Sequence, residues 1–115
     1  MTITRIQTLY VATADVPATA AFYEALFGLP PKFRDGERWV QFAVAGAGFA
    51  VASLEEAAAE ATGAVAVFEA DDPADHDRLV ALGAVPIAER DMGDHGRSRT
   101  YRDPAGTLFQ LFWRA

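Results

Sequence analysis

Residues 15–28 read DVPATAAFYEALFG, and residues 72–83 read DPADHDRLVALG. Each stretch opens with an aspartate, has a proline close behind it and ends at a glycine, and these residues commonly begin and end helices. The second stretch starts 57 positions after the first in a chain of 115 residues. We therefore expect one structural unit to occur twice, once in each half of the chain.

The segments around the two predicted helices have the composition of strands. Apolar and β-branched residues at strand length predict strands at residues 3–13, 39–44, 49–53, 63–70, 85–88, 98–102 and 108–113. The helices are expected over residues 18–27 and 72–82, with Asp15 as the first N-cap. The second half has the order βαβββ, and we expect the same unit in the first half, where two strands are assigned after the helix. The prediction is a single α+β domain over 1–115, with modules at about 1–53 and 63–115. We expect a curved mixed sheet around a pocket, with the helices outside.

Finer details of the first half follow from spacing. In the first helix Ala21, Phe22, Ala25 and Leu26 fall at helical spacing and are expected to pack on the sheet. Residues 45–48, AGAG, are expected to form a hairpin turn. The Ala- and Glu-rich residues 54–63 are expected to be a linker with room for one short helix.

Composition limits the function. The chain has no cysteine, which excludes disulfides, thiolate metal sites and thiol nucleophiles. The net charge of -6 disfavours nucleic acid as a partner and favours a cationic or neutral ligand. No run approaches the roughly 18 apolar residues of a membrane span, and the first residues lack the layout of a secretion signal. We expect a cytoplasmic protein with no membrane partner.

Two separated motifs carry a resemblance to a known superfamily. Residues 14–28, ADVPATAAFYEALFG, and residues 102–111, RDPAGTLFQL, resemble the signatures of the vicinal oxygen chelate superfamily. Its members include glyoxalase I, extradiol dioxygenases, fosfomycin-resistance enzymes and bleomycin-resistance proteins. The resemblance implies paired βαβββ modules with a U-shaped sheet around a pocket, and usually a homodimer whose subunits complete the sites. It does not imply one activity, because this fold hosts many.

Metal-dependent members of the superfamily bind their ion through His, Gln or Glu at four equivalent places of the repeat. By this resemblance, two of the four places lie seven residues before the aspartates that open the helices. The other two lie four residues after the glycines of the closing hairpins. Here they are Thr8, Val65, Ala52 and Gln110. A divalent ion normally needs three imidazole, carboxylate or thiolate ligands, so we predict no metal and no other cofactor. A bulge in the first strand would substitute Ile6 or Gln7 for Thr8 and add at most one amide oxygen.

Strand alternation predicts which side chains share a pocket with Gln110. On the last strand, Leu108 and Phe112 face the same way as Gln110. A five-residue turn, as the resemblance suggests, would pair Thr100 with Gln110 and place Ser98 on the same face. A four-residue turn would instead bring in Arg99 and Tyr101.

The first half contributes mainly aromatic candidates. Tyr10 shares the parity of Thr8 on the first strand, and Trp39 and Phe42 lie on a later one. Trp39 follows a polar run at a strand entry, where its ring can be half exposed and stack on a planar ligand. Core packing is the alternative for each aromatic residue.

The two histidines are interpreted differently. His76, between two aspartates of the second helix, is expected to be a solvated helix residue. His95 lies in the loop GDHG at residues 93–96, which borders the pocket mouth in the superfamily. It is either an exposed loop histidine or a ligand contact or general base oriented by Asp94, and it is the candidate catalytic residue.

The sequence therefore predicts a metal-independent, homodimeric protein that binds an aromatic or cationic, antibiotic-like molecule, as bleomycin-resistance proteins do. The expected ligand-binding residues are Thr8, Tyr10, Trp39, Phe42, His95, Ser98, Thr100, Leu108, Gln110 and Phe112. The main alternative is an enzyme of the same superfamily, a lyase, isomerase or dioxygenase. It would be metal-free with His95 or Glu69 as base, or metal-dependent with ligands at other positions. A purely structural or regulatory interaction module is disfavoured, because side chains would have to fill the cleft.

Overall fold

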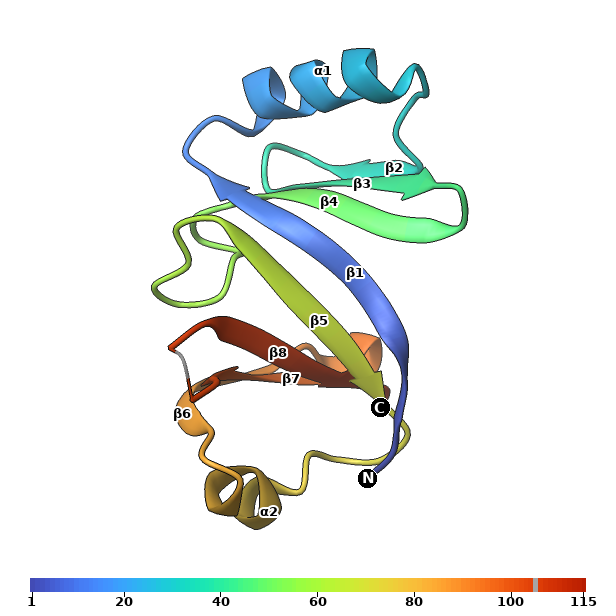
Figure 1. Cartoon of the computed structure of the whole chain (residues 1–115). Coiled ribbons are helices and arrows are strands. Elements are labelled where there is room, and N and C mark those ends of the chain that lie inside the picture. The colour runs from blue at the N-terminus through green and yellow to red at the C-terminus, as the bar shows by residue number, and fades with distance from the viewer. Residues whose placement is uncertain (105) are drawn as a thin grey trace. The chain divides into compact units, whose positions relative to one another are not determined.

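A computed structural model describes residues 1–104 and 106–115; Ala105, in the predicted turn 103–107, lies outside the described residues. The elements follow the order βαβββ twice (Figure 1). They are β1 (Ile3–Thr13), α1 (Val16–Phe27), β2 (Phe33–Asp35), β3 (Trp39–Val44), β4 (Ala47–Ser53), β5 (Ala64–Ala70), α2 (His76–Ala81), β6 (Val85–Asp91), the short 3-10 helix η1 (Gly93–His95), β7 (Arg97–Arg102) and β8 (Leu108–Trp113). The predicted α+β class is confirmed.

The chain divides into two compact units. Residues Thr8–Ala64 form one, here called the first-half unit, and Met1–Gln7 with Val65–Ala115 form the second-half unit. In the first-half unit the strands are ordered β2-β3-β4-β1, with β1 and β4 parallel and the other neighbours antiparallel. In the second-half unit the order β5-β8-β7-β6 likewise has one parallel pair, β5 with β8. The strand arrangement is therefore mixed, as predicted.

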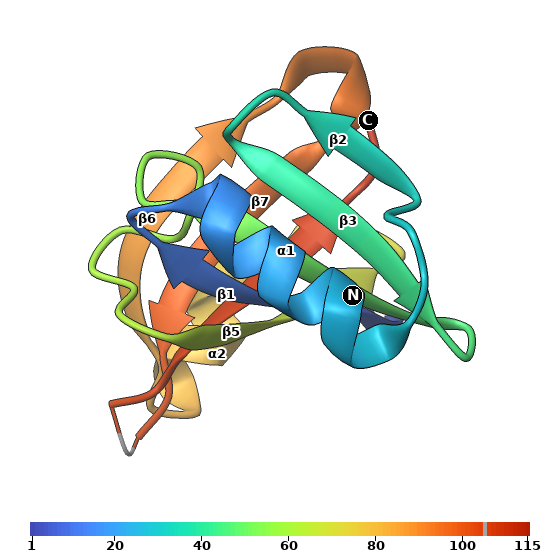
Figure 2. The same cartoon turned by 90° about the horizontal axis from the view of Figure 1, so that it is seen from above.

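Helix α1 starts at Val16, two residues before the predicted start, but its N-cap and its end are as predicted. The Asp15 side chain accepts a hydrogen bond from the Ala18 N–H (3.1 Å), and Gly28 ends the helix with φ +68°. The helix lies over the first-half sheet (Figure 2). The predicted contact face is wrong, because Phe22 and Leu26 are 61% and 64% exposed. The face that packs on the sheet is instead Val16, Ala20, Tyr23 and Phe27.

The β3–β4 hairpin is tighter than predicted. Val44 pairs with Ala47, so the turn is only Ala45 and Gly46, and both have positive φ (50° and 85°). This is the twist that two-residue hairpins require. Strand β4 consequently starts two residues before the predicted position. Strand β2 occupies part of the polar run before Trp39, where no strand was predicted, and residues 54–63 form turns without a helix.

Helix α2 is shorter than predicted. It begins at His76, because Asp75 is its N-cap and its carboxylate accepts from the Arg78 N–H (3.3 Å). Beneath it Tyr101, Leu111 and Trp113 form a buried core with Ala84. Strand β6 runs on to Asp91, three residues beyond the predicted strand 85–88, and residues 93–95 of the predicted loop form the 3-10 helix η1.

The register of the last hairpin is as the five-residue turn requires. Thr100 pairs with Gln110, and Ser98 with Phe112. Arg99 and Tyr101 point to the opposite face, where Tyr101 is fully buried in the core. The four-residue alternative is therefore wrong.

Candidate functional site

In each unit a helix covers one side of the sheet, and we call the other side the helix-free face. On β3, Val40 and Phe42 point to the side of the sheet that the helix covers. They pack with Val16 and Ala20 of α1. Phe42 is 0% exposed, and its ring lies 5.4 Å from that of Phe27. Alternation explains this placement. Phe42 offers no surface to a ligand, and we leave it out of the candidate set.

The helix-free face of the first-half unit carries a fixed aromatic pair. The rings of Tyr10 and Trp39 lie 5.3 Å apart at a 59° tilt. The Tyr10 hydroxyl accepts from the Ala58 N–H (2.8 Å), and the Trp39 Nε1–H donates to Gln41 Oε1 (2.9 Å). Tyr10 is buried, whereas Trp39 is only half-buried. Trp39 thus presents a ring whose orientation is set by its neighbours.

Gln41 is the residue that sequence reasoning missed here. Its Nε2 donates to Thr8 Oγ1 and to the carbonyls of Phe42 and Phe49, each at 3.3 Å. The parity it shares with Trp39 was a signal that could have revealed it. The contact also places Thr8 on the helix-free face. The alternative in which a bulge in the first strand puts Gln7 in the place of Thr8 is therefore not needed.

The helix-free face of the second-half unit carries the other predicted polar residues. Gln110 donates from Nε2 to Thr100 Oγ1 (2.9 Å), and Thr100 is buried. Ser98 and Leu108 are half-buried on the same face, and Phe112 is buried. The structure thus groups the predicted residues of β7 and β8 around one amide.

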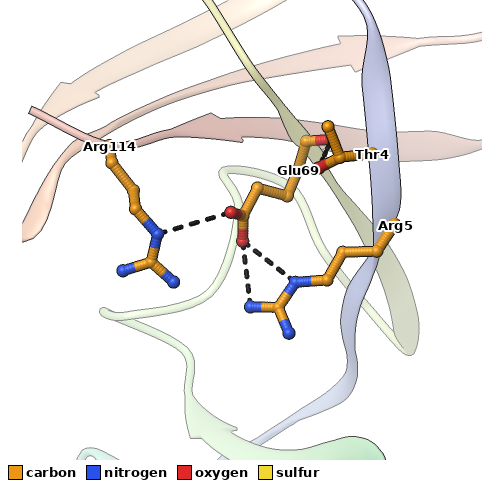
Figure 3. A network of polar contacts seen from close by, with 4 residues as sticks. All are labelled: Thr4, Arg5, Glu69 and Arg114. Carbon is orange, nitrogen blue, oxygen red and sulfur yellow. Dashed lines mark hydrogen bonds and ion pairs between the residues drawn. The ribbon is translucent and has the colours of Figure 1, made fainter.

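A network of charges lies on this face, as Figure 3 shows. Glu69 of β5 is 14% exposed in its side chain. Its Oε1 accepts from Nε and Nη2 of Arg5 (3.2 and 3.0 Å), and its Oε2 accepts from Nε of Arg114 (3.4 Å). The Arg114 guanidinium carbon also lies 5.9 Å from the centre of the Phe112 ring. Both carboxylate oxygens of Glu69 are therefore engaged by arginines, neither of which the sequence singled out.

The two histidines lie in different surroundings. His95 lies in η1 and is exposed, as is the neighbouring Asp94. His76 is half-buried, and its Nδ1 lies 3.1 Å from the hydroxyl of the buried Tyr101. The expectation of a merely solvated His76 is wrong, because the shorter α2 places it at the first turn, against the core.

The strand pairing corrects one position in the predicted metal set. Val67 pairs with Gln110 in one unit, and Tyr10, which corresponds to Val67 in the repeat, pairs with Ala50 in the other. The counterpart of Gln110 is therefore Ala50, not Ala52, because the turn glycine is Gly46. The four places then offer one hydroxyl, one amide and two apolar side chains, which does not fit a catalytic divalent ion. Among the described residues no three His, Cys, Asp or Glu side chains form a group that could hold a metal.

Across residues 1–104 and 106–115, no helix is long and apolar enough to cross a membrane.

Comparison with known proteins shows which family model the chain matches. The model of the glyoxalase-like domain family matches residues 8–112. A search of curated proteins found no match. Among solved structures, an NAD-dependent benzaldehyde dehydrogenase from Legionella pneumophila is 16% identical with a TM-score of 0.76, covering 94% of this chain and 98% of that one.

Two further structures have similar folds. A methylmalonyl-CoA epimerase from Mycobacterium tuberculosis is 17% identical with a TM-score of 0.69, covering 98% of this chain and 89% of that one. A glyoxalase/bleomycin resistance protein/dioxygenase superfamily member from Vibrio splendidus 12B01 is 14% identical with a TM-score of 0.71, covering 97% and 99%. At these identities the likeness extends to the fold alone.

Proposed function

The chain belongs to the glyoxalase-like domain family, which confirms its resemblance to the vicinal oxygen chelate superfamily, and from this premise we propose that it binds a small planar molecule, aromatic or cationic, without a metal. The observation that carries the proposal is the Tyr10–Trp39 pair. Hydrogen bonds from Ala58 and to Gln41 fix its two rings, and Trp39 remains half-buried.

A fixed, partly exposed indole suits stacking. Aromatic pairs contribute about 0.5–1.5 kcal/mol beyond the burial of their area, and a cation over an indole face adds a comparable attraction. Because Trp39 is already held by Gln41, little side-chain entropy is lost when a ligand orders it. This arrangement supports binding of a flat ring system more than of an aliphatic one.

Charge supports a cationic ligand. The chain carries 16 acidic and 10 basic side chains. A net negative protein attracts cations at long range and raises their association rate at low salt.

The test uses Trp39 as its own reporter. The chain has two tryptophans, and Trp113 is buried in the core of the second-half unit. A Trp113→Phe variant leaves Trp39 as the single indole. We expect ethidium, a planar cation, and bleomycin to quench its fluorescence saturably. Calorimetry on Trp39→Leu should show at least a tenfold loss of affinity, whereas the matched Trp113→Phe variant binds as the wild type does. Equal affinities for both variants would overturn the proposal.

Metal independence has its own measurement. We expect metal analysis of the purified protein to find far less than one ion per chain. Added Zn²⁺, Ni²⁺, Mn²⁺ or Fe²⁺ should not raise the melting temperature, because Thr8, Val65, Ala50 and Gln110 do not form a ligand set. If one metal ion were bound tightly per chain, a metal-dependent enzyme would become the favoured interpretation.

The enzymatic alternative has two candidate bases: His95, which is exposed in η1, and Glu69, a carboxylate on the helix-free face of the second-half unit. Its engagement by Arg5 and Arg114 favours a structural role over that of a general base. A metal-free lyase or isomerase using it would lose turnover by about 10²–10⁴ in Glu69→Gln. A binding protein would show no turnover to lose.

A further inference from the structure

The second-half unit carries an apolar groove on the helix side of its sheet. The groove encloses about 600 Å³, within the range of roughly 300–1,000 Å³ that small-molecule sites occupy. Its walls include Ile3 from β1, Phe68 and Phe109 from the sheet, and Leu79 and Leu82 from the α2 region. The groove lies on the opposite side of the sheet from Gln110 and Glu69. It is therefore separate from the candidate site described above.

The length of α2 explains why the groove is open. At about 1.5 Å per residue, the six residues of α2 span about 9 Å, half the length of the twelve-residue α1. Leu82 is the C-cap, and Gly83 after it has φ +105° and prevents a further turn. The rings of Phe68 and Phe109 consequently remain only half-buried, and Leu82 is 65% exposed at the rim. A short helix thus leaves part of an apolar sheet face uncovered.

One charged side chain lines this groove. Among the described residues the lining is apolar except for Thr2 and Arg78, and the Arg78 side chain is exposed. The helix caps use the backbone N–H and carbonyl of Arg78, so its guanidinium is not committed to capping. A guanidinium at the mouth of an apolar channel complements a molecule with an anionic head and an apolar tail.

We propose that this groove is a second ligand site and that it binds an aliphatic carboxylate. The chain lies along Phe68, Phe109 and Leu79, and the carboxylate meets Arg78 at the rim. The proposal does not depend on the stacking site at Trp39, which belongs to the first-half unit.

The decisive experiment compares ligands that differ in one property. Calorimetry with octanoate and decanoate should show saturable binding at one site, stronger by up to about fourfold per added methylene where the methylene is fully buried. Decanol should bind more weakly than decanoate to the wild type. In Arg78→Gln, affinity for decanoate should fall about tenfold while affinity for decanol stays unchanged. Arg90→Gln, an exposed arginine on β6 outside the groove lining, is the matched control and should behave as the wild type does.

A second variant tests the place of binding. Ile3→Asp puts a negative charge at the rim, where Ile3 is 43% exposed, so folding should survive while decanoate affinity falls by tenfold or more. Thermal melts of all variants verify folding. Three results would overturn the proposal: no saturable binding, equal losses for decanoate and decanol in Arg78→Gln, or binding only to lipid vesicles and not to the free carboxylate. Loss of decanoate binding in Trp39→Leu would also overturn the proposal, because the groove and the stacking site would then not be independent.

Discussion

Gln110 and Thr100 are joined across the β7–β8 pair by a hydrogen bond of 2.9 Å, from the amide Nε2 to the buried hydroxyl Oγ1. We expect Thr100→Val, which keeps the shape and removes the acceptor, to destabilise the protein by about 1 kcal/mol in urea unfolding. Thr100→Ser keeps the hydroxyl, so it should retain the bond and lose only the small packing contribution of the methyl group. A larger loss in Thr100→Ser than in Thr100→Val would show that packing, not the hydrogen bond, sets the cost.

Tyr10 holds a backbone group of the segment after β4. Its hydroxyl accepts from the buried Ala58 N–H over 2.8 Å. We expect Tyr10→Phe to cost about 1–3 kcal/mol of unfolding free energy, because it leaves that N–H without its acceptor. Amide hydrogen exchange at Ala58 should accelerate in the variant. Tyr23→Phe, on a half-buried ring by which α1 packs on the sheet, is the control and should change the stability little.

Gly96 marks a place where only glycine fits. Its φ is +105°, and an added Cβ would lie 2.5 Å from the Trp113 carbonyl oxygen and 2.9 Å from the Phe112 ring. Gly96→Ala should therefore destabilise the protein by on the order of 2–4 kcal/mol, measured by chemical unfolding. Gly93→Ala is the matched control, since Gly93 has φ +60° and open space around it. It should cost only about 1 kcal/mol for the backbone conformation.

Asp71 gives the stability a dependence on acid pH. The hydrogen bond from the Thr2 N–H, 2.6 Å long, holds the pKa of the Asp71 carboxyl below its usual value of 3.8. A carboxyl whose pKa is lower in the folded state contributes stability above its unfolded pKa and loses it as the pH falls through the folded pKa. The stability difference between wild type and Asp71→Asn should therefore be full near neutral pH and shrink below about pH 4. Because the group is exposed, added salt should also reduce the difference. A difference that is constant with pH would contradict this account.

Much of the local structure could be predicted from the sequence. The bounds of β1, β3 and β8 match the prediction, as do the Asp15 N-cap and the Gly28 stop. These features depend on residues close together in the chain, such as a capping carboxylate, a turn glycine or an alternating strand. The pairing of Thr100 with Gln110 was also predictable, because the length of one turn sets it.

The contact face of α1 could not be predicted in the same way. The stripe with Phe22 and Leu26 and the stripe with Tyr23 and Phe27 both recur at helical spacing. The direction in which β1 delivers the chain decides which one meets Phe42 and Phe49. The engagement of Glu69 by Arg5 and Arg114 was hidden for a related reason, since the three residues are far apart in sequence.

The sequence by itself determined the βαβββ repeat, the family and the poverty of metal ligands, because these depend on residue identity and local spacing. Only the tertiary structure decided which rings are half-buried, that Gln41 orients Trp39, that His76 meets Tyr101, and that a short α2 leaves a groove beside Arg78. The physical reason is that burial and side-chain hydrogen bonds depend on which distant strands become neighbours. Local propensity does not encode that choice.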